Sequence, residues 1–213
     1  MKTEDLWIFA YGSLCWQPGF EYEEMVVGHI KGWVRRFWQG NQVHRGTAEK
    51  PGVVATLVPD QDGETYGCAY RVNPQAYQKT LKYLDNRETK LGGYDSKRSL
   101  FYPCDDSETE PFLAILYIAL PGNVDWRGPG ELEDIADEVI TATGVCGSNI
   151  AYVTDLAAFL RTHEFKDDHV FELEAIVLEK LRVEDSNSSN ASVISEDEEE
   201  EEEGSDSLES SIE

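Results

Sequence analysis

Basic residues are scarce in this sequence. It holds 18 Lys and Arg against 42 Asp and Glu, which gives a formal net charge of −24. A nucleic-acid-binding protein presents a concentrated basic face to the phosphates, so we expect no nucleic-acid partner here. No apolar run approaches the roughly 20 residues that span a bilayer. The first residues, Met1–Asp5, are acidic where a signal peptide is basic. The sequence therefore predicts neither a membrane partner nor secretion.

Cysteine pairs and metal-binding spacings are also missing. The four cysteines, Cys15, Cys68, Cys104 and Cys146, lie far apart and form no Cys-x-x-Cys pair. Such isolated cysteines are typical of free thiols in a reducing compartment, which predicts a cytosolic protein. The four histidines fall in no metal-ligand spacing. The sequence also lacks a Gly-x-Gly-x-x-Gly turn, a phosphate-binding Gly-Lys-Ser/Thr loop and a Gly-x-Ser-x-Gly elbow. We therefore expect no metal and no cofactor, and proton-transfer chemistry if the protein is an enzyme.

Charge divides the chain into two parts. Residues 184–213 contain thirteen acidic residues and no Lys or Arg, in a segment composed mainly of Ser, Asn, Asp and Glu. Such a segment buries too little apolar surface to offset the entropy of the chain. We predict a disordered acidic tail at 184–213 that either solubilises the protein or binds a protein partner, with Ser195 in a context that acidophilic kinases favour. Residues 1–183 are long enough for one domain with a sizeable core.

The domain combines strand patterns with one helix pattern between them and three helix patterns after them. Strands are predicted at the start of Trp7–Leu14 and at Val26–Gln39, Gly52–Val58, Thr65–Val72, Leu100–Tyr102 and Phe112–Ala119. Short turn signals such as Pro59–Gly63 favour antiparallel pairing in a curled or barrel-like sheet. Apolar residues at three- and four-residue spacing predict helices at Pro74–Thr89, Glu131–Thr143, Asn149–His163 and Asp168–Arg182, with Gly144 as a C-terminal cap. The predicted class is α+β.

The stretch Trp7–Leu14 combines a buried strand with an abrupt turn at Tyr11-Gly12-Ser13. A glycine in such a turn lets successive backbone N–H groups point into one concavity, where an anion or a carbonyl oxygen can bind. A strand that simply ends in a turn glycine explains the same pattern. The stretch is therefore a candidate binding loop.

Glu88 is the most informative single residue. It shares a predicted helix face with Tyr77, Leu81 and Leu84, at spacings of four, three and four. That face is otherwise apolar, and a partly buried carboxylate has the raised pKa that a general acid or base needs near neutrality. A helix-end glutamate neutralised by its neighbour Arg87 is the alternative.

Two further segments combine residues that suit a ligand site. Leu91–Asp95 contains two glycines, which allow close approach of the backbone, and Tyr94, which offers a hydroxyl. Arg35–Gly40 and His44–Gly46 bring together arginines, aromatic residues and glycines, as a wall that binds a carboxylate through arginine would. A simple loop and exposed strand arginines remain the alternatives.

Several stretches together resemble the ChaC family of glutathione-specific γ-glutamylcyclotransferases. They follow the family's order and spacing over about residues 6–182, and the Leu-Gly-Gly-Tyr-Asp run resembles the ChaC1 branch more than ChaC2. The stretches are Trp7–Leu14, Arg35–Gly40, His44–Gly46, Pro51–Leu57, Gly67–Arg71, Tyr83–Tyr94, Phe101–Pro103 and Gly128–Pro129.

The resemblance implies a γ-glutamylcyclotransferase-like fold, a mixed barrel-like sheet with peripheral helices. It also implies a cofactor-independent lyase that cleaves glutathione to 5-oxoproline and cysteinylglycine, with Glu88 as the catalytic residue. The substrate-binding candidates, from the resemblance and from the residues above, are Ile8, Phe9, Ala10, Tyr11, Gly12, Ser13, Leu14, Arg45 and Tyr94. Two alternatives stay open: a cyclotransferase for other γ-glutamyl amines or dipeptides, and a non-catalytic binding protein with an acidic interaction tail.

Overall fold

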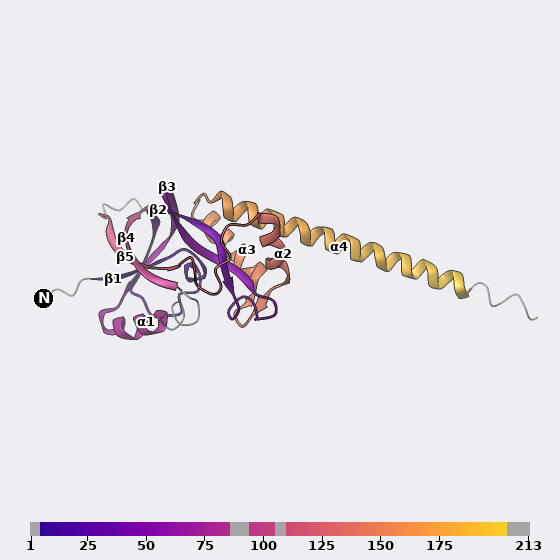
Figure 1. Ribbon diagram of the computed structural model, residues 1–213, viewed down its shortest axis with the longest axis horizontal. Helices are drawn as coiled ribbons and strands as arrows, with labels where there is room; N and C mark the ends of the chain where they lie inside the picture. The colour runs from indigo at the N-terminus through magenta and orange to yellow at the C-terminus, as the bar shows by residue number, and fades with distance from the viewer. Residues whose placement is uncertain (1–4, 86–93, 105–109, 204–213) are drawn as a thin grey trace, which may run out of the picture.

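A computed structural model describes residues 5–85, 94–104 and 110–203, with side chains as far as residue 187. Five strands close into a barrel in the order β1-β3-β2-β4-β5 (Figure 1). The strands are β1 (Leu6–Ala10), β2 (Glu24–Asn41), β3 (Gly52–Val72), β4 (Tyr94–Pro103) and β5 (Phe112–Ala119). The strands pair antiparallel, except that β1 and β5 close the barrel in parallel through Ile8 and Ile115. The predicted α+β class and the mixed barrel-like sheet are confirmed.

One strand prediction was wrong in an instructive way. Gly52–Val58 and Thr65–Val72 are not two strands but the two ends of the continuous strand β3, which pairs with β2 along its length. The register shifts between the pairs Lys31–Glu64 and Trp33–Pro59, so extra residues of β3 bulge out opposite Gly32, whose φ is +84°. Within the bulge the Asp60 carboxylate accepts the Asp62 N–H. The turn residues therefore form a bulge that bends the strand without reversing it.

Two smaller predictions also need correction. β4 begins at Tyr94 rather than Leu100, because its first half is a polar segment that carries no apolar alternation. Helix α2 (Leu132–Thr141) ends before Gly144, because Ala142 adopts an extended conformation. Gly144 instead lies in β6 (Thr143–Gly144), which pairs with β7 (Gly147–Ser148) in a short hairpin.

Helix α1 (Tyr77–Leu84) follows a 3-10 turn at Pro74–Ala76 and packs against the barrel. The side chain of Asn73 caps this turn by accepting the Gln75 N–H, with proline at the first position as predicted. Leu84 is fully buried, while Tyr77 and Leu81 are half-buried. The part of the predicted helix after Asp85, which includes Glu88, lies outside the described residues.

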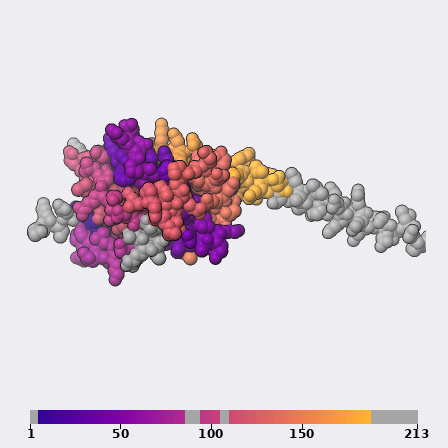
Figure 2. All heavy atoms as spheres, in the orientation of Figure 1, coloured from indigo at the N-terminus to yellow at the C-terminus, as the bar shows by residue number. Residues whose placement is uncertain are grey.

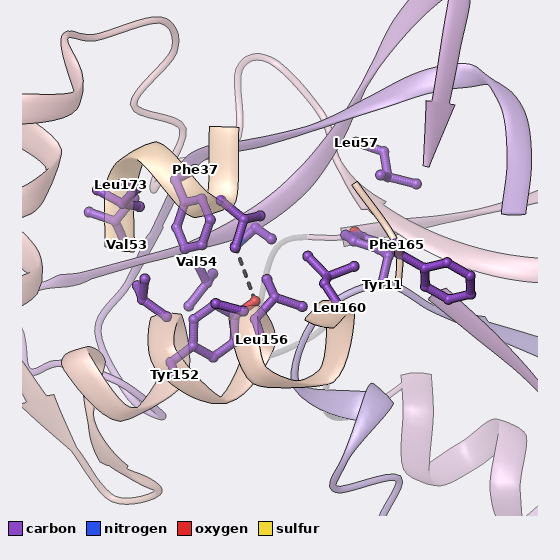
Figure 3. Packing of buried hydrophobic residues seen from close by; sticks show 14 of the residues in the cluster. Tyr11, Phe37, Val53, Val54, Leu57, Tyr152, Leu156, Leu160, Phe165 and Leu173 are labelled. Atoms are coloured by element: carbon purple, nitrogen blue, oxygen red, sulfur yellow. Dashed lines mark hydrogen bonds between the residues drawn. The ribbon is translucent and has the colours of Figure 1, made fainter. Parts of the chain in front are cut away.

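Helices α2, α3 (Asn149–Thr162) and α4 (Asp168–Glu203) pack together beside the barrel (Figure 1). The buried Asn149 side chain ties α3 to β3: it accepts the Val53 N–H at 2.6 Å and donates to the Val53 carbonyl at 2.9 Å. α3 also presents Tyr152, Leu156 and Leu160 to the core, toward Phe37, Val53 and Val54 (Figure 3). This four-residue spacing is the apolar stripe of a helix that packs by one face.

Helix α4 extends further than the sequence predicts. The last residue of α4 that packs against the main core is the partly buried Leu181, and beyond it the backbone stays helical to Glu203 and projects from the body (Figure 1). In Figure 2 the described side chains of α4 already extend past the rest of the body. Glutamate is a good helix former, so its run propagates a helix that the core has already nucleated. The domain boundary at residue 183 stays a prediction. None of the helices in the described ranges is long and apolar enough to span a membrane.

Arg35 joins the barrel to the helices. Its side chain is 1% exposed, its Nε donates to the Tyr11 carbonyl at 2.8 Å, and its Nη atoms donate to the Tyr66 carbonyl and the Asp167 carboxylate. One guanidinium thus links the end of β1, β3 and the start of α4. Arg35 had been predicted as part of a carboxylate-binding wall, but its donors are used inside the protein.

We predict that Arg35→Met strongly destabilises the fold. The substitution leaves the Asp167 carboxylate and two buried carbonyl groups without their donor, and breaking a buried ion pair costs about 3–5 kcal/mol. Urea unfolding monitored by circular dichroism measures the loss. The matched control is Arg71→Met, because Arg71 pairs with Glu23 and Glu24 on the exposed surface of β3. Similar losses in the two variants would contradict a central role for Arg35.

Candidate active site

A cavity of about 370 Å³ opens where the end of β1 meets α3. Most of the residues singled out in the sequence line it: Phe9, Ala10, Tyr11, Gly12, Ser13, Leu14, Arg45 and Tyr94. These residues come from segments far apart in the chain, which the barrel brings together. Ile8 is the exception, because it is fully buried in the core beside Cys68 and Tyr70. Glu88 and Leu91–Gly93 lie outside the described residues.

The turn after β1, residues 11–15, is held in place through its carbonyl groups. Tyr11 accepts from Arg35, and the Leu14 and Cys15 carbonyls accept from the hydroxyl of Tyr70 at 2.9 and 3.2 Å. Within the turn, the Gly12 carbonyl accepts the Cys15 N–H at 2.9 Å. In the described part of the chain, the N–H groups of Gly12 and Leu14 make no hydrogen bond. The carbonyl groups are thus satisfied by the protein, and two N–H groups stay available at the cavity wall.

Gly12 is required by close approach rather than by backbone conformation. Its φ of −132° is accessible to other residues. A Cβ at this position would lie 2.7 Å from the hydroxyl oxygen of Tyr152, which is closer than two such atoms pack. Glycine therefore lets the hydroxyl of an α3 residue reach the turn.

The loop after β2 is organised by one side chain. The Asn41 carboxamide oxygen accepts the N–H groups of Val43, His44 and Arg45 at 3.3, 2.7 and 2.9 Å. Three donors on one acceptor fix the loop without regular secondary structure. This fold of the loop brings both His44 and Arg45 to the cavity.

Arg45 is a buried cation at the cavity wall. It is 5% exposed, its Nη1 donates to the Ser148 carbonyl at 3.3 Å, and its guanidinium carbon lies 5.5 Å from the ring centre of Tyr152. Among the described residues, no carboxylate forms an ion pair with it. A buried cation without an anionic partner is costly, so this guanidinium suits an anionic group that enters the cavity.

Two tyrosines that line the cavity have defined hydrogen bonds. The Tyr94 hydroxyl, on β4, donates to the Ala55 carbonyl at 3.0 Å, and the Tyr11 hydroxyl donates to the Tyr117 carbonyl on β5. Tyr83 at the end of α1 also lines the cavity. The described residues on either side of Glu88 therefore contribute to the same wall.

Sequence reasoning missed several lining residues. They are polar or aromatic side chains from six different segments: Gln17, Asn41, Tyr83, Tyr117, Cys146 and Tyr152. The most buried of them is Tyr152, at 4% exposure, whose hydroxyl accepts the Ala55 N–H at 3.2 Å. Burial raises the pKa of Tyr152 to about 12, so the phenol is neutral near pH 7. In the sequence, its spacing with Leu156 and Leu160 indicated only a core position.

Known proteins are similar to this chain in sequence. A profile of the ChaC-like protein family matches residues 6–180. The "Glutathione-specific gamma-glutamylcyclotransferase 1" of Mus musculus is 44% identical over 174 residues, which cover 81% of this chain and 76% of the mouse protein. The "Glutathione-specific gamma-glutamylcyclotransferase" of Escherichia coli K12 is 31% identical over 168 residues, which cover 79% of this chain and 71% of that protein.

The fold is shared as well. The crystal structure of a yeast γ-glutamylcyclotransferase specific to glutathione superposes with a TM-score of 0.76 at 25% identity. The superposition covers 83% of this chain and 97% of the yeast chain. The predicted γ-glutamylcyclotransferase-like fold is thereby confirmed. Because the family profile spans the barrel and the helices that form the cavity, this chain belongs to the ChaC-like protein family.

Proposed function

We propose that this protein is a glutathione-specific γ-glutamylcyclotransferase, a lyase that cleaves glutathione into 5-oxoproline and cysteinylglycine. The observation that carries the proposal is the convergence of Phe9–Leu14, Arg45 and Tyr94 on one cavity. A volume of about 370 Å³ suits a small ligand. The printed names of the mouse and bacterial relatives specify glutathione as the substrate.

The reaction is an intramolecular attack. The α-amine of the γ-glutamyl group bonds to its own γ-carbonyl carbon, and the amide bond to the cysteinyl nitrogen breaks. Holding the two reacting groups together removes much of the entropic barrier, so a rigid cavity supplies a large part of the rate. The turn at residues 11–14 is suited to this task because Arg35 and Tyr70 fix its carbonyl groups.

Proton transfer is assigned to Glu88. The amine loses a proton as it attacks, and the departing nitrogen gains one, so a single carboxylate near both atoms serves as base and then as acid. Glu88 lies outside the described residues, and its assignment rests on the family resemblance and on chain connectivity. Tyr83 and Tyr94, five residues before it and six after it, both line the cavity.

Recognition of the substrate is assigned to Arg45 and to the turn. Glutathione carries two carboxylates, and a guanidinium binds a carboxylate through paired N–H groups. The N–H groups of Gly12 and Leu14, which make no hydrogen bond among the described residues, suit a ligand group that accepts hydrogen bonds. This supports recognition of the glutamyl moiety and stabilisation of negative charge on the γ-oxygen.

The compartment and the partners are part of the proposal. None of the four cysteines, Cys15, Cys68, Cys104 and Cys146, forms a disulfide in the described part of the chain, which supports a reducing compartment such as the cytosol. The acidic residues 184–213 follow the family match, which ends at residue 180. A protein partner for this tail remains a prediction that only the composition supports.

Substrate choice separates the proposal from its nearest alternative. Release of 5-oxoproline is compared for glutathione, γ-glutamyl-alanine and γ-glutamyl-lysine at equal concentration. Preference for glutathione supports the proposal, whereas preference for the other two indicates a cyclotransferase for γ-glutamyl amines. No 5-oxoproline from any of them would indicate a non-catalytic binding protein.

We predict that Glu88→Gln loses turnover while the fold remains intact. General acid–base catalysis contributes about 100- to 10,000-fold, so the rate of cysteinylglycine release falls by at least about 100-fold. Chromatographic product analysis with glutathione measures the rate, and circular dichroism checks the fold. Glu131→Gln on the exposed surface is the control. Near wild-type release by Glu88→Gln would refute the assignment.

We predict that Arg45→Lys raises the KM for glutathione. Lysine keeps the charge but loses the planar fork, so the carboxylate contact weakens by about 1–2 kcal/mol and KM rises about tenfold. Initial rates over a range of glutathione concentrations measure the change. Arg98→Lys, on the exposed part of β4, is the matched control. An unchanged KM in Arg45→Lys would rule out the contact.

We predict that a chain ending at residue 183 keeps the turnover of the full chain. The last residue of α4 that packs against the main core is Leu181, and none of the described side chains of α4 lines the cavity. Steady-state kinetics with glutathione compares the two proteins. Loss of turnover on truncation would show that the acidic tail takes part in catalysis.

A further inference from the structure

Tyr152 packs its ring in the core and also borders the cavity. It lies on the face of α3 that also carries Leu156 and Leu160, and those two side chains are fully buried (Figure 3). Tyr152 differs from them because it also lines the cavity. Phe37 and Trp16 contact its ring edge-on, at centroid distances of 6.0 and 5.7 Å. The ring is thus held by packing, and its hydroxyl has a fixed position.

Within the described ranges, the Tyr152 hydroxyl accepts a hydrogen bond through its oxygen but donates none. The Ala55 N–H donates to the oxygen at 3.2 Å. A phenol also donates one hydrogen bond, and within the described ranges no acceptor receives it. Buried hydroxyl groups normally find an acceptor. Because this one borders the cavity, the missing acceptor is expected on the substrate.

The same hydroxyl lies directly beside the turn after β1. Its oxygen is 2.7 Å from the place that a Cβ of Gly12 would occupy. The Gly12 N–H also makes no hydrogen bond in the described part of the chain. Two donors, one from α3 and one from the turn, therefore border the same small region of the cavity.

The electrostatic setting favours a neutral donor. Burial raises the pKa of Tyr152 to about 12, against the opposing influence of the Arg35 and Arg45 charges, so the hydroxyl keeps its proton near pH 7. A neutral donor binds an amide carbonyl weakly and an oxyanion strongly. This difference stabilises the transition state more than the bound substrate and so lowers the barrier of the reaction. Arg45, which is charged and adjacent, is better suited to a carboxylate.

We infer that Tyr152 donates a hydrogen bond to the γ-carbonyl oxygen of the substrate and stabilises the oxyanion that forms there. This inference rests on the proposed cyclotransferase function. When the α-amine bonds to the γ-carbon, the π electrons of the carbonyl move onto its oxygen. The Tyr152 hydroxyl stabilises that charge and keeps its own proton. The electrons return when the bond to the cysteinyl nitrogen breaks, and that nitrogen takes the proton that the amine released.

The test is Tyr152→Phe, assayed by 5-oxoproline release from glutathione. Removal of one oxyanion donor lowers kcat by about 100- to 1,000-fold, and KM changes little because the ground state gains little from the bond. Tyr77→Phe is the matched control, since the Tyr77 hydroxyl also accepts a strand N–H, that of Leu6 at 2.9 Å, and does not line the cavity. Both variants lose some thermal stability, but only Tyr152→Phe loses kcat.

A second variant keeps the hydroxyl and changes its acidity. Replacement of Tyr152 by 3-fluorotyrosine retains the acceptor for Ala55 and makes the phenol a stronger donor, so kcat stays equal to or above that of the wild type. A raised KM with unchanged kcat in Tyr152→Phe overturns the inference. So does an equal loss of kcat in Tyr77→Phe, or a fluorotyrosine protein far slower than the wild type. If the wild type itself releases no 5-oxoproline, the proposed function fails rather than the role of Tyr152.

Discussion

The hydrogen bonds of the buried Arg35 guanidinium are the constraint on which the cavity depends. They reach the Tyr11 carbonyl after β1, the Tyr66 carbonyl on β3 and the Asp167 carboxylate before α4. These partners offset the large cost of removing the Arg35 charge from water. The end of β1, the barrel wall and the helices must therefore assemble together, and this assembly brings Gly12 and Tyr152 to the same cavity.

In the turn after β1, the backbone carbonyl groups and the backbone N–H groups have different surroundings. Its carbonyl groups accept hydrogen bonds from Arg35 and Tyr70, which belong to the barrel. Two of its N–H groups border the cavity, where Tyr152 adds a hydroxyl. Because the carbonyl dipoles are held by the protein, the N–H groups need not reorient when negative charge develops nearby. Preorganised dipoles of this kind are the usual source of oxyanion stabilisation.

The sequence predicts local features better than long-range partners. Strand β1 and its turn, helix α3 and the proline start of α1 follow from short patterns. The turn residues Pro59–Gly63 correctly indicate an interruption of the regular strand. Whether the interruption becomes a turn or a bulge depends on the pairing of β3 with β2. Of the candidate site, the turn, Arg45 and Tyr94 were found through pattern and resemblance. Tyr152 was not found, because its place in an apolar helical stripe predicts a core residue. Only the structure shows that its hydroxyl lies beside Gly12.

Arg35 and Arg45 show why residue type alone does not locate a binding site. Both are buried arginines, but the Arg35 guanidinium pairs with a carboxylate of the protein. The Arg45 guanidinium donates to the Ser148 carbonyl and lies over the Tyr152 ring, and it has no carboxylate partner among the described residues. The first arrangement stabilises the fold. The second keeps a desolvated cation at the cavity wall, which costs the free protein stability. A substrate carboxylate that pairs with Arg45 removes this cost, so binding and stability are coupled at this residue.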